Sequence, residues 1–278
     1  MELEIIRFIQ SFHTPLLDQL FQFITQFGEA PFKIMFVLGI YWCIDKRMGE
    51  YLSYSFYTNL MFNHTVKNIV NAKRPIGEEG VRSLRVSTAT GSSFPSGHSQ
   101  GAASTYGAAY LILRRYKSAI ILLILVLLVG LSRLYLGVHY PKDVVCGILF
   151  GLTISYCTYR LFLRSEDKSK LYLATLVLFL PFLLVLPHHP AHMVGEYLGF
   201  IVGVAFEKKY VNFKVKGRIA MRLFRFMIGI VSLFILKWCL ITLPFKGMVY
   251  QFLYGGLLAF YSFAGYPYLF RWLNKGKH

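Results

Sequence analysis

The chain has 278 residues, of which 55% are hydrophobic and only 15% are charged. Soluble domains carry about 25% charged residues, and apolar stretches of about 20 residues, long enough to cross a bilayer as a helix, recur along the whole chain. This composition excludes a soluble globular protein and predicts an all-α polytopic membrane protein.

Residues 1–28 differ from the rest because they are amphipathic rather than continuously apolar. Aromatic and aliphatic residues alternate there with polar ones, and Pro15 divides the segment into two short helices. Amphipathic helices of this kind lie along the membrane interface. We therefore predict an interfacial segment over residues 1–28.

The remainder of the chain reads as a series of apolar helices. The expected membrane-crossing segments are residues 30–44, 51–70, 98–113, 119–136, 143–163, 171–186, 193–206, 226–243 and 251–270. The second of them carries polar residues at steps of four and three, namely Asn59, Asn63, Lys67, Asn71 and Arg74. This spacing places them on one helical face, which must point into the protein because lipid cannot satisfy it.

The distribution of basic residues predicts the orientation in the membrane. The net charge is +17, and most of the 30 basic residues fall in turns on one side of the predicted helices. Such turns face the cytoplasm, so the charge does not indicate a nucleic-acid partner. The loop 71–95 and the turn 136–143 then face outward. We expect a multi-pass protein of the cell membrane with these two segments on its extracytoplasmic side.

Three groups of polar residues stand near the ends of the apolar helices. They are Lys67 with Arg74-Pro75, then Pro95-Ser96-Gly97-His98, and then Ser132-Arg133 with His139 and Asp143. Charged side chains are costly at the edge of a membrane and usually mark a functional site there. The predicted topology places all three groups at the same outward-facing edge.

The third group contains a candidate nucleophile. Pro141 suits the first turn of a helix, which brings Asp143 into that turn and leaves His139 just before it. A carboxylate bound to one imidazole nitrogen fixes the tautomer and leaves the other nitrogen with a free lone pair. We predict that His139 attacks phosphorus and that Asp143 orients it.

The other groups supply an anion site and a proton donor. Ser96 and Gly97 open a helix whose backbone N–H groups suit an anion, and His98 can protonate the leaving oxygen as a general acid. Three cations can surround the phosphoryl group and stabilise its charge, namely Lys67, Arg74 and Arg133. The sequence thus predicts a site that hydrolyses phosphate esters.

The spacing of these residues resembles a known three-part motif. Lys67-x6-Arg74-Pro75, Pro95-Ser96-Gly97-His98 and Ser132-Arg133-x5-His139-x3-Asp143 match the motif of the type 2 phosphatidic acid phosphatase superfamily at every position. The resemblance covers about residues 30–163. It implies a helical core of that family's kind, dephosphorylation without a metal or other cofactor, and a phosphohistidine intermediate. It assigns His139, His98 and Asp143 to catalysis and the cations, Ser96 and Gly97 to phosphate binding.

With this resemblance, we divide the chain into the interfacial segment 1–28, a catalytic transmembrane core over 29–165 and additional C-terminal transmembrane helices over 166–278. Arg82 and Arg85 in the outer loop are possible head-group contacts or ordinary surface residues. A turn with His188, His189 and His192 lacks a nearby carboxylate, so we read it as interfacial loop and predict no metal site.

The predicted function is removal of the terminal phosphate from a membrane lipid phosphate or diphosphate. Polyprenyl diphosphate, phosphatidylglycerophosphate and phosphatidate are the natural candidates, because a site at helix ends favours an amphiphile over a soluble sugar phosphate. The alternative is a non-catalytic lipid-phosphate carrier or transporter. The pair of His139 and Asp143 argues against a carrier, because binding alone needs no nucleophile. A vanadate-dependent oxidase is a more distant alternative.

Overall fold

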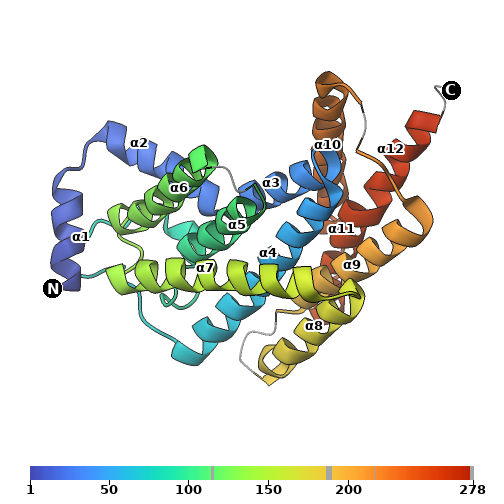
Figure 1. The fold of residues 1–278 in the computed structure, drawn as a ribbon. Helices are drawn as coiled ribbons and strands as arrows, with labels where there is room; N and C mark the ends of the chain where they lie inside the picture. Colours follow the sequence, from blue (N-terminus) through green and yellow to red (C-terminus); the bar gives the residue numbers. More distant parts are fainter. Residues whose placement is uncertain (114–115, 186–189, 216, 276–278) are drawn as a thin grey trace. The chain divides into compact units, whose positions relative to one another are not determined.

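The computed structural model describes residues 1–113, 116–185, 190–215 and 217–275, and within them every regular element is helical (Figure 1). The all-α prediction is therefore confirmed. The α-helices are α1 (Glu2–Ser11), α2 (Pro15–Ile24), α3 (Ala30–Cys43), α4 (Lys46–Val70), α5 (Gly97–Leu113), α6 (Tyr116–Tyr135), α7 (Pro141–Arg164), α8 (Lys168–Val185), α9 (Ala191–Phe206), α10 (Ile219–Ile241), α11 (Met248–Phe260) and α12 (Tyr266–Lys275). Shorter helical turns are η1 (Thr25–Gly28), η2 (Val86–Thr88), η3 (Glu207–Val211) and η4 (Tyr261–Gly265).

The contacts divide the chain into two units. Unit 1 comprises Met1–Ile34 and Tyr51–Arg164, and unit 2 comprises Met35–Glu50 and Ser165–His278. The three groups of predicted site residues all belong to unit 1. Its internal packing therefore decides the geometry of the site.

Several helices meet the length and hydropathy that a bilayer demands. Among the described residues, α7, α8 and α10 are long and apolar enough to cross a membrane. Pro15–Gly28 and Ala30–Cys43 pass the same test together, as one segment bent by 51°. The polar face of α4 lowers the hydropathy of that 25-residue helix, and α6 has a shorter apolar part.

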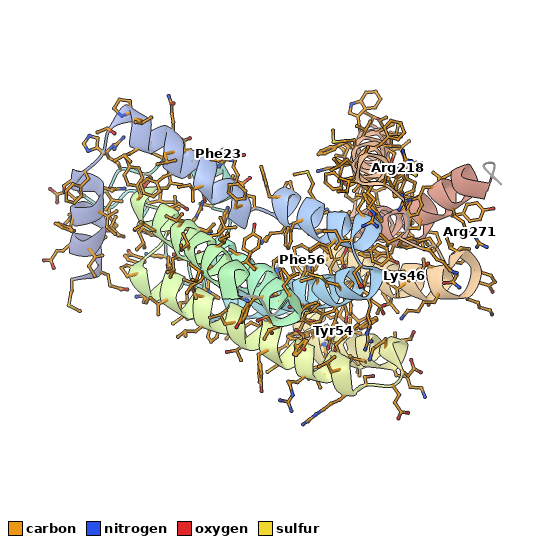
Figure 2. The ribbon with its side chains drawn as sticks, turned by 45° about the horizontal axis from the view of Figure 1, so that its top comes forward. Phe23, Lys46, Tyr54, Phe56, Arg218 and Arg271 are labelled. Carbon is orange, nitrogen blue, oxygen red and sulfur yellow. The ribbon has the colours of Figure 1, made fainter. Side chains whose placement is uncertain are left out.

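The N-terminal segment breaks where the sequence predicts. Pro15 is the first residue of α2, and the Thr14 hydroxyl accepts a hydrogen bond from the Leu17 N–H over 3.2 Å. Proline suits this position because no helical partner is available for an N–H there. The side chain of Phe23 projects outward from α2 and is 54% exposed, as suits contact with lipid (Figure 2).

The polar face of α4 points into unit 1 as predicted, but it does not include Asn71 and Arg74, which lie beyond the end of the helix at Val70. The Asn63 amide donates to the Gln100 carbonyl oxygen over 2.8 Å, and the Gln100 amide donates to Asn59 over 2.9 Å. Buried amides need such partners because an unpaired polar group opposes folding. These bonds join α4 to the first turns of α5.

Small residues bring α5 and α7 into close contact, and the two helices run side by side in Figure 1. A Cβ atom on Gly151 would lie 2.3 Å from the Gln100 carbonyl oxygen and 2.7 Å from the Ala103 Cβ. A Cβ on Gly147 would lie 2.9 Å from the Ser96 carbonyl oxygen. The backbones approach so closely that only glycine fits, which fixes the start of α5 against α7.

Gln10 connects α1 to the outer part of unit 1. Its amide donates to the carbonyl oxygens of Arg82, over 2.6 Å, and Tyr135, over 2.8 Å. Its own carbonyl oxygen accepts from the Arg82 N–H over 3.0 Å. The N-terminal segment is therefore bound to the loop 71–95 and to the end of α6.

In unit 2, glycines bring α9 and α11 into close contact, as they do α5 and α7 in unit 1. A Cβ on Gly195 would lie 2.0 Å from the Phe252 carbonyl oxygen, and one on Gly199 would lie 2.2 Å from that of Gly256. The short helix α9 thus packs tightly against α11. Elsewhere in this unit, Glu207 pairs with Lys46 over 3.0 Å.

Candidate active site

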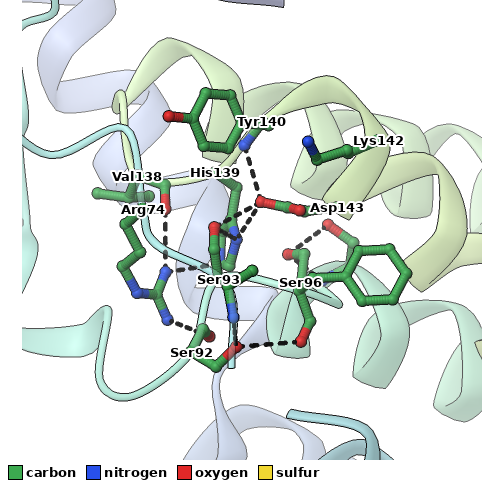
Figure 3. Close-up of polar contacts among 12 residues, drawn as sticks. Arg74, Ser92, Ser93, Ser96, Val138, His139, Tyr140, Lys142 and Asp143 are labelled. Atoms are coloured by element: carbon green, nitrogen blue, oxygen red, sulfur yellow. Dashed lines mark hydrogen bonds and ion pairs between the residues drawn. The ribbon is translucent and has the colours of Figure 1, made fainter. Parts of the chain in front are cut away.

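Unit 1 gathers the three predicted groups at one set of helix ends. Lys67 lies in the last turn of α4 and Arg133 in the last turns of α6. Ser96 directly precedes α5, and Asp143 lies in the first turn of α7. The contact between Arg74 and His139, shown in Figure 3, joins the first group to the third, and a backbone hydrogen bond from Ser96 to Asp143 joins the second group to the third.

His139 and Asp143 form a buried pair. His139 Nδ1 lies 3.4 Å from Asp143 Oδ2, and the side chains are 2% and 0% exposed. The same carboxylate oxygen accepts from the Ser93 hydroxyl over 2.5 Å and from the Tyr140 N–H over 2.9 Å. The carboxylate is thereby held in place beside the imidazole (Figure 3).

Arg74 determines the tautomer of His139. Its Nη1 lies 3.0 Å from His139 Nε2 and also donates to the Val138 carbonyl oxygen over 2.9 Å. A guanidinium has donors only, so Nε2 must accept with its lone pair. The imidazole proton then lies on Nδ1, which faces Asp143. Nε2 is therefore the nitrogen with nucleophilic character.

The surroundings of His139 also keep it neutral. Burial, followed by the charges of Arg74, Arg133 and Lys67, holds the pKa of His139 well below its usual value. Both causes disfavour the imidazolium because it would be desolvated and repelled by like charges. A neutral imidazole keeps the lone pair that an attack on phosphorus requires.

Arg74 itself is fixed by the loop that precedes α5. Its guanidinium donates to the carbonyl oxygens of Thr90 (2.8 Å), Gly91 (2.9 Å) and Ser92 (3.2 Å). Burial lowers the pKa of Arg74. The Lys67 ammonium also donates to the Ser92 carbonyl, so one stretch of backbone holds both cations.

Arg133 presents two free donors. It is fully buried, and Nη1 donates to the Thr25 hydroxyl over 2.8 Å. Its Nε and Nη2 have no hydrogen-bond partner although both are buried. Buried donors without a partner are rare in folded proteins. An anion with several acceptor oxygens, such as a phosphoryl group, would satisfy them.

The start of α5 supplies the second predicted group. The Ser96 hydroxyl lies 2.9 Å from that of Ser99, and the Ser96 N–H donates to the Asp143 backbone carbonyl over 3.0 Å. A Cβ on Gly97 would lie 3.2 Å from Asn63 Oδ1 and 3.8 Å from Lys67 Cε. Gly97 thus brings the α5 backbone next to the end of α4.

Three residues of the site were missed by the sequence analysis. Ser93 holds Asp143, Thr25 holds Arg133, and Glu29 has a carboxylate oxygen 4.0 Å from Nε2 of His98. Ser93 lies in a loop rich in serine and threonine, Thr25 lies in the N-terminal segment, and Glu29 directly follows that segment. None belongs to a spacing pattern that would have distinguished it.

The two candidate head-group contacts are paired within the protein. Arg82 Nη2 lies 2.7 Å from Asp18 Oδ2, and Arg85 Nη2 lies 2.7 Å from Glu29 Oε1. Asp18 lies in the N-terminal segment, and Glu29 directly follows it. The positive charge of these arginines is therefore largely compensated, unlike that of Arg133.

Of the histidine-rich turn, His192 lies within the described residues. Within the described residues, no group of three His, Cys, Asp or Glu side chains is arranged to hold a metal ion. His188 and His189, which the sequence analysis considered, lie outside the described residues.

Comparisons with known proteins match both parts of the chain. The PAP2 superfamily profile matches residues 50–167, and that of the transmembrane extension of PAP2 superfamily phosphatases matches residues 191–278. Undecaprenyl-diphosphatase BcrC of Bacillus subtilis is 29% identical over 60% of this chain and 85% of its own length. An undecaprenyl-diphosphatase of Sulfolobus acidocaldarius is 30% identical over 55% of this chain and 74% of its own length.

Among solved structures, a PAP2-type phosphatidylglycerolphosphate phosphatase of Bacillus subtilis aligns with a TM-score of 0.48 and 26% identity, over 56% of this chain and 81% of the other. The three-part motif, the helical fold and the two profile matches agree. This chain therefore belongs to the PAP2 superfamily of membrane phosphatases and carries the family's transmembrane extension.

Proposed function

We propose that this protein removes the terminal phosphate from a membrane lipid phosphate or diphosphate through a phosphohistidine intermediate. The observation that supports the proposal most strongly is the buried His139, whose Nε2 lone pair accepts from Arg74, together with the two buried and unpartnered donors of Arg133. Relatives named undecaprenyl-diphosphatases support a lipid substrate. Polyprenyl diphosphate, phosphatidylglycerophosphate and phosphatidate are the candidates.

In the first step, Nε2 of His139 attacks the terminal phosphorus. A P–N bond forms while the P–O bond to the leaving group breaks, and His98 gives its proton to the departing oxygen. The negative Asp143 carboxylate stabilises the positive charge that develops on the imidazole ring. Before the attack, Arg74 must transfer its donor from Nε2 to a phosphoryl oxygen.

In the second step, water releases the phosphate. His98, now neutral, accepts a proton from the water as its oxygen attacks phosphorus, and the P–N bond breaks. Inorganic phosphate leaves, and both histidines return to their starting protonation states. No oxidant, reductant or metal ion takes part in this scheme.

The cations stabilise the phosphoryl charge during both steps. Arg74 is held by four backbone carbonyls, and two buried nitrogens of Arg133 have no partner and are available to a bound anion. Donors fixed in advance need no reorganisation when the transition state forms, which is why such groups are effective in buried sites. Lys67 and the start of α5 complete the phosphate-binding region.

The proposed location is the extracytoplasmic side of the cell membrane. The support is the distribution of basic residues, which by the positive-inside rule places the loop 71–95 and the turn 136–143 outside. A site at helix ends near the membrane surface suits a substrate whose chain stays in the bilayer while its phosphate enters the protein.

Phosphate release by the purified protein tests the proposal. The assay compares the three candidate lipids in the presence of a chelator, with the His139→Ala variant as control. We expect release with at least one lipid, no turnover by the variant, and lipid binding that the variant retains. Binding of lipid phosphates without release by the folded wild-type protein would instead indicate a carrier.

A further inference from the structure

We infer that the turn formed by residues 25–29 positions two groups of the active site, with Thr25 acting through Arg133 and Glu29 acting through His98. This inference rests on the proposed function. The turn precedes the part of the chain that matches the PAP2 superfamily profile, residues 50–167. It is therefore a contribution of this chain beyond the three-part motif.

The turn is packed against the helices that carry the site. A Cβ on Gly28 would lie 2.7 Å from Val129 Cγ1 on α6 and 3.0 Å from His98 Cβ on α5. The Tyr106 hydroxyl of α5 donates to the Phe27 carbonyl oxygen over 2.8 Å. Such close contact leaves little room for the turn to move, so its side chains keep a fixed relation to the site.

Thr25 fixes the orientation of Arg133. The threonine is fully buried, and its hydroxyl accepts from only one of the guanidinium nitrogens, Nη1, over 2.8 Å. One nitrogen of the planar guanidinium is thereby fixed, while Nε and Nη2 remain available to donate to a ligand. Thr25 thus sets the direction of the two donors that we assign to the phosphoryl group.

Glu29 supplies negative charge beside His98. Its Oε1 lies 4.0 Å from His98 Nε2, a separation longer than a hydrogen bond but close enough for strong attraction between charges. Arg85 bonds the same oxygen over 2.7 Å, which keeps the carboxylate ionised and in place. The side chains of Glu29 and His98 are only 17% and 13% exposed, so solvent screens this attraction weakly.

The charge of His98 depends on a balance of neighbours. The charged groups that face it are Glu29, Arg133 on α6 and Lys33 on α3. Burial and the two cations favour the neutral imidazole, whereas the Glu29 carboxylate favours the imidazolium. A general acid must carry its proton before the leaving group departs. Glu29 is therefore the charged neighbour that favours the proton-donating form of His98, against the effects of burial and of the two cations.

The two residues should affect different parts of the reaction. Thr25 acts on charge at the phosphoryl oxygens, which develops with any substrate. Glu29 acts on protonation of the leaving group, which matters for an alkoxide but little for a phenolate that is stable without a proton. Substrates that differ only in their leaving group therefore separate the two roles.

The experiment measures kcat and KM for phosphatidate and for p-nitrophenyl phosphate. Glu29→Gln should lower kcat for phosphatidate by about 30-fold and for p-nitrophenyl phosphate by less than about threefold, with KM nearly unchanged. Thr25→Val should lower kcat for both substrates by a similar factor of about 10. Glu4→Gln and Thr153→Val, at exposed positions of α1 and α7, serve as matched controls and should leave both activities unchanged.

Two further variants guard against a trivial loss of folding. Glu29→Asp keeps the negative charge on a shorter side chain. It should therefore lower kcat for phosphatidate more than for p-nitrophenyl phosphate, by smaller factors than Glu29→Gln, and it provides the test if Glu29→Gln does not fold. In a His98→Asn background, Glu29→Gln should cause no additional loss. Equal losses on both substrates, or additive effects in the double variant, would overturn the role of Glu29.

The same measurements test the proposed function independently of the positioning role. If the wild-type protein releases phosphate and His139→Ala does not, the proposed function stands whatever Glu29→Gln does. Wild-type kcat for both turn variants would then refute only the positioning role. If wild-type protein releases no phosphate from either substrate, the proposed function fails and the positioning role fails with it.

Discussion

Replacing Arg133 with methionine should stabilise the unliganded protein while it lowers the activity. Arg133 is fully buried, and its one hydrogen bond is to a neutral partner, Thr25. The charged groups that act on it are the cations Arg74 and Arg85 and the carboxylate of Glu29. A desolvated charge with so few direct partners opposes folding, and methionine of similar length removes this penalty.

The two effects have different magnitudes. Apolar replacement of buried, poorly compensated charges stabilises proteins by about 1–4 kcal/mol. The substitution also leaves the Thr25 hydroxyl without its partner, which offsets part of this gain. We therefore expect a net stabilisation of about 1–2 kcal/mol at this site. The substitution also removes both unpartnered donors, and loss of one oxyanion donor raises the barrier by about 3 kcal/mol. This increase corresponds to a decrease in kcat of about 100-fold.

Thermal unfolding in detergent and phosphate release measure the two effects on the same preparations. Added vanadate, which mimics phosphate, should raise the Tm of the wild-type protein more than that of Arg133→Met, because a ligand stabilises the state that binds it. Arg225→Met is the matched control. Arg225 is 5% exposed, donates to the Trp42 carbonyl over 3.2 Å and lies 4.4 Å from the ring centroid of Phe270.

The control should lose stability and keep its kcat, because Arg225 has favourable contacts and lies outside the site. Arg133→Met should do the reverse on both counts. A lower Tm for Arg133→Met than for the wild-type protein, or a kcat within threefold of wild type, would refute the reasoning that this arginine is kept for catalysis at the expense of stability.

Three further predictions concern the nucleophile and the helix packing. Ser93→Ala removes a 2.5 Å hydrogen bond to the carboxylate that orients the nucleophile, so kcat should fall by about tenfold while vanadate affinity measured by thermal shift stays unchanged. The folded-state pKa of His139 lies well below 6.5. Its stabilising contribution is therefore present above pH 6.5 and decreases as the pH falls toward the folded-state pKa. His139→Asn should consequently lose less Tm than the wild-type protein between pH 7 and pH 5, and an equal loss would contradict the assignment. Gly151→Ala places a Cβ 2.3 Å from a carbonyl oxygen of α5 and should destabilise the fold by about 3 kcal/mol in urea unfolding. Gly256→Ala, whose Cβ would have its nearest neighbour at 3.4 Å, should cost less than about 1 kcal/mol.

The parts of the molecule that depend on local patterns could be predicted from the sequence. The inward polar face of α4 follows from the steps between Asn59, Asn63 and Lys67, and the start of α7 follows from Pro141. Because the ends of neighbouring spans meet at one membrane edge, the three polar groups were expected to come together, and they do in unit 1.

The supporting residues could not be predicted because their partners are distant in sequence. Thr25 and Arg133 are 108 positions apart, and Ser93 and Asp143 are 50 apart. Threonine and serine serve equally well as helix caps, turn residues and surface residues, so their type carries little information. Likewise, the sequence shows that Arg85 is charged but not that Glu29 compensates it. The packing of residues 25–29 against α5 and α6 reveals the partners of Thr25 and Glu29, and the contact between the loop before α5 and α7 reveals that of Ser93.

The place of Gly28 has a practical consequence for chimeric proteins. A transplant of residues 50–167 into another scaffold would carry the full motif yet leave behind the turn that abuts His98 and Val129. The recipient protein would need a segment without a side chain at the position of Gly28, because a Cβ there would clash with Val129 and His98. Domain exchanges within this family should therefore include the first 34 residues of the donor chain, so that unit 1 moves as a whole.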